Sequence, residues 1–228
     1  MILTLPNYVP IVFICTTALT LFLLYKSTNR SLYTVLISCI WLIIQGIFSS
    51  KGFFLDATSA PPRIIIAILP PLLLIVMIFI LPAGRKFAYT LDPEKLSWMH
   101  IVRVPVEVVL FWLFTAGQIP ELMTFEGRNF DILSGLTAPL IIYFGFIKRT
   151  LSHKIIIGWN FICLILLLNV VINGIFAAPT IFQQQAFDQP NVAVLKFPFI
   201  WLPCFIVPVV MFSHLVVIRK LIRSQSTA

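Results

Sequence analysis

IIIAILPPLLLIVMIFIL, the run from Ile64 to Leu81, contains eighteen successive residues without a charged or hydrogen-bonding side chain. A helix needs about 20 apolar residues to cross the roughly 30 Å hydrocarbon core of a bilayer. This run therefore predicts a transmembrane helix.

The composition of the whole chain agrees with this prediction. Of its 228 residues, 60% are hydrophobic and 11% are charged, and the mean hydropathy is +1.03. Soluble domains contain about 45–50% apolar residues, so this chain requires lipid as its solvent. The net charge of +8 does not indicate nucleic acid, because the basic residues lie in short loops between apolar runs.

Seven apolar runs predict a single all-α domain over residues 1–228, a polytopic bundle of seven transmembrane helices in the lipid bilayer. The runs are Tyr8 to Tyr25, Leu32 to Phe48, Ile64 to Leu81, Ile101 to Gln118, Ile132 to Ile147, Ile155 to Ala177 and Phe197 to Ile218.

The distribution of Lys and Arg predicts the orientation. Alternate loops place eleven basic residues on one side and four on the other, and Arg103 inside the fourth run completes the sixteen. Cytoplasmic loops carry the excess of positive charge. We expect an outer N-terminus, a cytoplasmic C-terminus and a multi-pass location in a bacterial inner membrane.

Ionisable side chains recur along one face of the fourth run. At 100° per residue, His100, Arg103, Glu107, Phe111, Phe114 and Gln118 fall within about 40° of their mean direction. Charges at mid-membrane cost about 2.5–3.5 kcal/mol on insertion scales, so this face should point into the bundle. Arg103 is expected near the cytoplasmic interface, within reach of water, and Glu107 deeper.

Two interpretations of Glu107 and Arg103 stay open. Glu107 is either a proton- or cation-coupling carboxylate with Arg103 as its partner, or half of a buried ion pair that fixes helix packing. Asn169 and Asn173 in the sixth run complete the candidate intramembrane polar site with Gln118. They either contact substrate or hydrogen-bond between helices.

The histidines suggest an alternative chemistry. His100 and His214 lie at similar predicted depth, where they could hold a haem or a metal ion, or be ordinary amphipathic residues. Proline residues inside several runs, among them Pro105, Pro139 and Pro208, either build a binding site from broken helices or are simply common in membrane helices.

The outer loops are rich in acidic residues. We expect a cation-attracting mouth, although solvated loops explain the same pattern. The candidate mouth residues are Glu121, Glu126, Arg128, Asp131 and Asp188.

Motifs of known enzymes are missing from the sequence. It contains no GxSxG, HExxH or P-loop pattern, so enzymes built on these motifs are not favoured. The runs MTFEGRNFD at Met123 to Asp131 and FDQPN at Phe187 to Asn191 resemble those of small, uncharacterised seven-helix membrane proteins of Bacteroidota. That resemblance implies a fold but no activity.

The sequence therefore favours a transporter of a small solute or ion, with Glu107 coupling the movement to protons. Two alternatives remain: a membrane enzyme or electron-transfer protein with a His-ligated cofactor, and a scaffold or sensor subunit with a protein partner. The leading hypothesis requires no cofactor.

Overall fold

The computed structural model describes residues 5–226, which contain no β-strand, so the all-α prediction is confirmed for this range. The elements in chain order are α1 (Tyr8–Ser27), α2 (Leu32–Ser50), η1 (Phe53–Leu55), α3 (Ile65–Ile80), α4 (Pro82–Thr90), α5 (Pro93–Ser97), η2 (Trp98–Val102), α6 (Arg103–Thr115), η3 (Glu121–Met123), α7 (Ile132–Ile141), η4 (Ile142–Ile147), α8 (His153–Ala177), η5 (Ala193–Leu195), η6 (Leu202–Ile206) and α9 (Val207–Ser226). The short η elements are 3-10 turns, except η4 and η6, which are π-helical.

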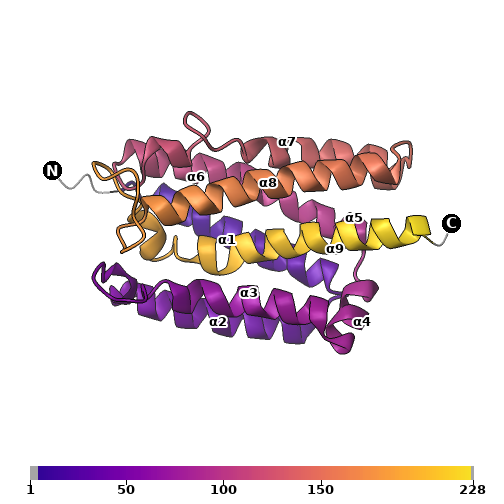
Figure 1. Ribbon diagram of the computed structural model, residues 1–228, viewed down its shortest axis with the longest axis horizontal. Coiled ribbons are helices and arrows are strands. Elements are labelled where there is room, and N and C mark those ends of the chain that lie inside the picture. Colours follow the sequence, from indigo (N-terminus) through magenta and orange to yellow (C-terminus); the bar gives the residue numbers. More distant parts are fainter. Residues whose placement is uncertain (1–4, 227–228) are drawn as a thin grey trace.

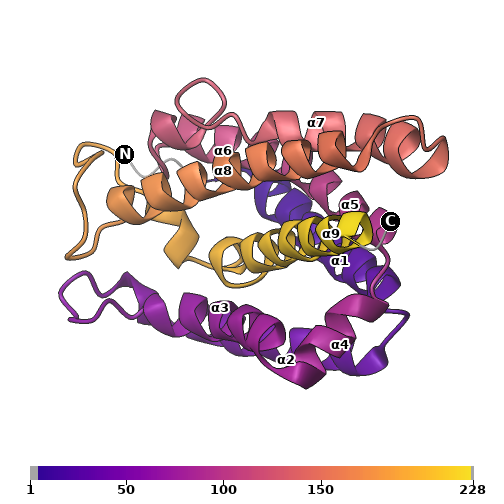
Figure 2. The ribbon, with the colours of Figure 1, turned by 45° about the vertical axis from the view of Figure 1, so that its right-hand side comes forward.

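The long helices run side by side along the longest axis of the molecule, and the loops gather at its two ends (Figure 1). Five helical segments are long and apolar enough to cross a membrane: Tyr8–Ser27, Leu32–Ser50, Pro93–Thr115, His153–Ala177 and Leu202–Ser224. Helix α3 continues into α4 through a bend of 91°, so α4 lies across one end of the bundle (Figure 2). The segment Ile132–Ile147 is apolar but shorter.

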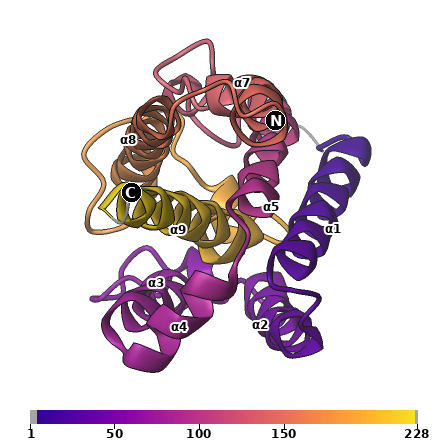
Figure 3. The same ribbon diagram turned by 90° about the vertical axis from the view of Figure 1, so that its right-hand side faces the viewer.

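Two helical segments occupy the inside of the bundle. Pro93–Thr115 and Leu202–Ser224 are buried over 61% and 67% of their length, against 22–33% for the other three candidate spans. In the end-on view, α9 and α5 lie between the outer helices α1, α2, α3, α7 and α8 (Figure 3). Arg103 and Glu107 on α6 and Ser213 and His214 on α9 are buried and therefore face other helices rather than lipid.

The inner helix that carries the ionisable face has a defined start and end. Asp92 caps it, with its Oδ1 accepting a hydrogen bond from the Glu94 N–H at 2.9 Å. At the other end, Gly117 adopts φ +69°, and the N–H of Gln118 donates to the Leu113 carbonyl at 2.9 Å. This is a Schellman termination, which needs a left-handed residue and so favours glycine.

The predicted boundaries of the fourth run were therefore displaced. The helical segment covers Pro93–Thr115 rather than Ile101 to Gln118. As a result, Arg103 lies halfway along the segment, not near its end, and Gln118 lies outside the helix.

Proline reshapes the second inner segment. Pro208 has no N–H to donate to the carbonyl of Cys204 four residues earlier, and the π-helical η6 immediately precedes this turn. The indole Nε1–H of Trp41 on α2 donates to that carbonyl at 3.0 Å. The indole Nε1–H of Trp201, just before η6, donates to the Leu42 carbonyl on α2 at 2.9 Å. These two indoles fasten α2 to the inner segment.

Gly135 sets the distance between α7 and the inner helix. A Cβ atom at this position would lie 2.8 Å from Cγ2 and 3.0 Å from the backbone N of Val104. Asp131 lies four residues before Gly135, so both face the same neighbour. The missing side chain of Gly135 allows Asp131 to come close to α6.

We expect Gly135→Ala to destabilise the protein by about 1–3 kcal/mol, because overpacking forces the helices apart. Gly158→Ala is the matched control, since a Cβ on Gly158 meets no atom within 4 Å. Unfolding of both variants by SDS titration in mixed micelles measures the difference. Equal stability of the two variants would contradict the assigned role of Gly135.

Candidate functional site

Arg103 is the centre of a buried polar network, which we define as His100, Arg103, Glu107, Asn129, Asp131, Asn160, Ser213 and His214. Its side chain is almost completely buried, with a residue exposure of 2%. Nη1 forms an ion pair with Oδ1 of Asp131 at 2.7 Å and also donates to the Cys163 carbonyl at 3.3 Å. Nη2 lies 2.8 Å from Nε2 of His214. The guanidinium thus joins α6 to α8, α9 and the residue preceding α7.

This arrangement corrects two predictions. Arg103 does not reach the cytoplasmic interface, because its helix begins eight residues before the predicted run and other helices enclose it. Asp131 does not belong to a solvated outer mouth: it is only 4% exposed and is the ion-pair partner of Arg103. The sequence suggested Glu107 for that partner.

Glu107 is instead bound by an amide. The Nδ2 atom of Asn129 lies 2.8 Å from Oε1 and 2.7 Å from Oε2, and it also donates to the Met123 carbonyl at 2.9 Å. The Oδ1 atom of Asn129 accepts the backbone N–H of Asp131 at 2.9 Å. One loop side chain therefore fixes both Glu107 and the start of α7.

The two inner histidines stack face to face. The ring centroids of His100 and His214 are 3.9 Å apart, with 16° between the ring planes, and Trp159 lies edge-on to His100 at 5.4 Å. Since Arg103 can only donate, Nε2 of His214 is the acceptor. The proton is then on Nδ1, which lies 2.8 Å from Oδ1 of Asn160. The hydrogen bonds thus assign the tautomer of His214.

His100 ends the network on the α5 side. Ser213 donates to the Leu96 carbonyl at 2.7 Å, so its oxygen can accept from Nε2–H of His100 at 3.4 Å. Nδ1 of His100 is buried and has no hydrogen-bond partner in the described part of the chain. In this tautomer Nδ1 carries no proton.

The charges of the network do not balance. It contains one guanidinium and two carboxylates, and the guanidinium is paired with Asp131. Within residues 5–226, no cation lies at ion-pair distance from Glu107, which is 1% exposed. A bare carboxylate in an apolar interior is costly. A bound proton or a cation at Glu107 would remove this cost.

Sequence reasoning therefore located part of the network. It placed His100, Arg103 and Glu107 on one buried face, which the structure confirms. It did not assign Asn129 and Asn160 to the site. Asn129 lies in the run MTFEGRNFD, two residues before Asp131. An Asn side chain commonly accepts the backbone N–H two residues later, and this spacing was the available signal.

The remaining candidates of the intramembrane site lie elsewhere, at the outer-loop end. Gln118 accepts a hydrogen bond from Lys196 at 3.1 Å. Asn169 donates to the Arg128 carbonyl at 2.8 Å, and Asn173 donates to the Asn169 carbonyl at 2.9 Å. The bonds of Gln118 and Asn169 join separate segments of the protein, and that of Asn173 lies within α8, which favours a packing role over substrate contact.

The predicted mouth residues other than Asp131 are all exposed: Glu121 at the start of η3, and Glu126, Arg128 and Asp188 in loops. In another loop, the hydrogen bond from Thr58 lowers the pKa of Asp56, which also pairs with Arg63 at 2.6 Å.

The FDQPN run has a structural role. Gln189 donates to the carbonyls of Phe114 and Ile119 at 3.0 and 2.6 Å, so it ties this loop to the end of α6.

The geometry does not favour the haem or metal hypothesis for His100 and His214. Their rings stack instead of converging on a shared space, and both nitrogens of His214 have protein partners. In residues 5–226, no three His, Cys, Asp or Glu side chains are grouped as metal ligands.

Residues 61–222 match a family described as Domain of unknown function (DUF8737). The chain belongs to this family. The matched range includes every residue of the buried polar network of this DUF8737 member, whereas α1 and α2 precede it. Searches of curated proteins and of solved structures returned no match.

We expect Asp131→Asn to destabilise the protein by about 3–5 kcal/mol, because it leaves the Arg103 guanidinium buried without its counter-charge. Asp56→Asn breaks the ion pair with Arg63. The side chains of Arg63 and Asp56 are 39% and 26% exposed, so this change should cost at most about 1 kcal/mol. SDS unfolding compares the two. Similar losses in both variants would contradict the central position of the Arg103 pair.

Proposed function

We propose that this protein moves a small solute or ion across a bacterial inner membrane and couples that movement to protonation of Glu107. The observation that carries the proposal is the uncompensated carboxylate: Glu107 is buried against neutral Asn129 while Arg103 is committed to Asp131. Ionisable groups inside membrane helices commonly belong to ion or proton pathways. Binding and release of one positive charge at Glu107 would be the coupling event.

The proposed topology has seven spans, with the N-terminus outside and the C-terminus in the cytoplasm. Five candidate spans are supplemented by α3 and by the segment Ile132–Ile147. Each of these two has sixteen residues and rises about 24 Å, short of the roughly 30 Å core. Helix α4 would then lie along the cytoplasmic surface. The excess of basic residues at this end supports the orientation.

A topology test uses single cysteine substitutions in a chain whose native cysteines are replaced. A membrane-impermeant maleimide should label Glu126→Cys in intact spheroplasts, because the α6–α7 loop is proposed to be outside. Lys148→Cys should be labelled only after permeabilisation. The reverse pattern would contradict the orientation, and labelling of both in intact cells would contradict the span count.

The proposed path has a barrier on each side of the network. Outside, the α6–α7 loop covers Glu107 through Asn129, and Met123 and Thr124 of this loop are buried as well. On the other side, the stacked His100 and His214 separate Arg103 from α5. In this closed arrangement, displacement of the Asn129 loop would expose Glu107 outward.

Glu107→Gln provides the functional test, because glutamine retains the shape and an acceptor for Asn129 but cannot exchange a proton. We expect the variant to fold, and its proton flux in proteoliposomes with a trapped pH-sensitive dye to fall to that of protein-free vesicles. Glu126→Gln is the matched control, since that carboxylate is exposed in the loop. It should retain the wild-type flux.

The same vesicles can be screened with small solutes by measuring charge movement on a supported membrane. A solute-dependent current that requires a proton gradient and disappears in Glu107→Gln would support coupling. Solute transport that is unchanged in Glu107→Gln would remove Glu107 from the mechanism. A protein without any solute or proton flux that purifies with a stable partner would favour the scaffold or sensor role.

A further inference from the structure

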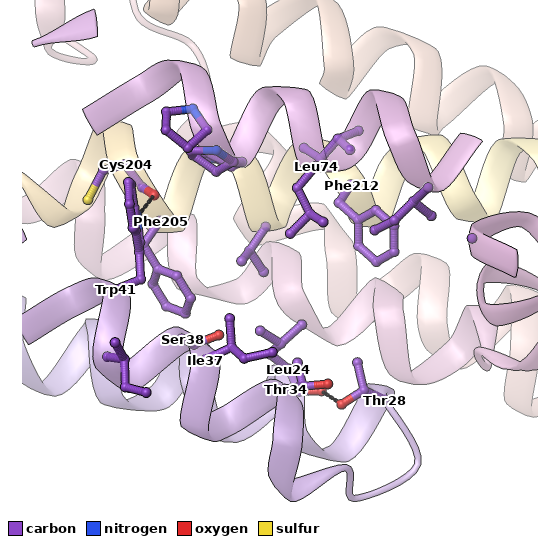
Figure 4. A pocket seen from close by; sticks show the side chains of 18 of the residues that line it. Leu24, Thr28, Thr34, Ile37, Ser38, Trp41, Leu74, Cys204, Phe205 and Phe212 are labelled. Atoms are coloured by element: carbon purple, nitrogen blue, oxygen red, sulfur yellow. Dashed lines mark hydrogen bonds between the residues drawn. The ribbon is translucent and has the colours of Figure 1, made fainter. Parts of the chain in front are cut away.

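An apolar cavity of about 710 Å³ opens on the side of the bundle, away from the buried polar network. Helices α2 and α3 form its walls, and η6 and the first half of α9 form its floor (Figure 4). Trp41, Leu74, Phe205 and Phe212 contribute to this lining. The volume falls within the roughly 300–1,000 Å³ of small-molecule sites.

The length of the cavity matches one leaflet of a bilayer. On α2 the lining residues run from Thr34 to Ile44, and the ten steps between these two residues rise about 15 Å. This is about half of the roughly 30 Å hydrocarbon core. The cavity therefore extends from near the middle of the bundle to one end, which is the depth of a single acyl chain in one leaflet.

Basic residues lie near one end of the cavity. The α1–α2 turn and α4 meet there, joined by a hydrogen bond from Asn29 to the Thr90 carbonyl at 3.3 Å. Gly84 and Phe87 of α4 line the cavity, and the exposed Arg85 and Lys86 lie between them in the chain. Arg30 in the turn is exposed as well, and no acidic residue occurs in residues 26–34 or 81–91.

We propose that this cavity binds an anionic phospholipid, with an acyl chain between α2 and α3 and the phosphate against Arg30, Arg85 and Lys86. An apolar slot of one-leaflet length selects an acyl chain, and basic residues at its interfacial end select a negative head group. The 91° bend between α3 and α4 turns Arg85 and Lys86 of α4 along the membrane surface. The proposal is independent of Glu107, and only the cytoplasmic identity of the leaflet rests on the proposed orientation.

Most of the lining is apolar, and its polar side chains are Thr28, Thr34, Ser38, Trp41 and Cys204. The indole N–H of Trp41 is already bonded to the Cys204 carbonyl, and the hydroxyl of Thr28 to the Leu24 carbonyl at 2.8 Å. The hydrogen-bonding groups of these two lining residues are thus used by the protein. An acyl chain in the slot would gain van der Waals contacts with the protein, and the basic residues at the end of the slot would recognise only its charged head group.

The test is native mass spectrometry of the protein released from nanodiscs with equal amounts of phosphatidylglycerol and phosphatidylcholine. We expect the wild type to retain one phosphatidylglycerol molecule in preference to phosphatidylcholine. Ser38→Phe should remove it, because Ser38 lines the cavity and the ring would occupy the slot. Arg85→Gln/Lys86→Gln should lower the apparent affinity about tenfold or more, from the loss of two interfacial charges.

Two control variants make equivalent changes away from the cavity. Ile43→Phe enlarges an exposed residue of α2 that is not part of the lining, and Lys148→Gln/Lys154→Gln removes two charges at the α7–α8 connection. Both should retain the lipid as the wild type does. Equal retention in all variants, equal binding of both phospholipids, or recovery of an uncharged isoprenoid would each overturn the proposal. Size-exclusion chromatography confirms that every variant is folded.

Discussion

A guanidinium in the middle of a membrane helix is the constraint around which this protein is arranged. An isolated arginine at that depth costs about 2.5–3.5 kcal/mol on insertion scales, so its donors require partners from other helices. Asp131, the Cys163 carbonyl and His214 supply them for the two terminal nitrogens. The geometry of α7, α8 and α9 around α6 follows from these contacts, and Gly135 allows the close approach that the ion pair requires.

Because Arg103 forms its ion pair with Asp131, Glu107 is left with an amide partner and without a counter-charge at ion-pair distance. A network built only for packing gains nothing from a second, unpaired carboxylate, since an apolar side chain of similar size would be less costly to bury. This imbalance is the physical reason to connect the site with a mobile positive charge. The loop that binds Glu107 also begins α7, so movement of Asn129 would affect both carboxylates.

The sequence predicted the helices well and the partners poorly, for different physical reasons. Apolar runs of membrane length and a 3.6-residue period depend on local chemistry, so the common face of His100, Arg103 and Glu107 could be recognised. The pairing of Arg103 with Asp131 is tertiary, and hydropathy alone placed Asp131 in a solvated loop. Two glycines in the sequence indicate features that the apolar pattern does not. Gly117 ends the helix before Gln118, and Gly135 marks the close helix contact one turn after Asp131.

The most direct test of this account is the protonation pattern of His214, measured by nitrogen-15 NMR of histidine-labelled protein in lipid, with the His214→Gln variant for assignment. Donation from Arg103 to Nε2 and bonding of Nδ1 to Asn160 predict a proton on Nδ1 and none on Nε2. That result would place the guanidinium against the imidazole at the centre of the bundle. A proton on Nε2 would contradict the contact and the network built on it.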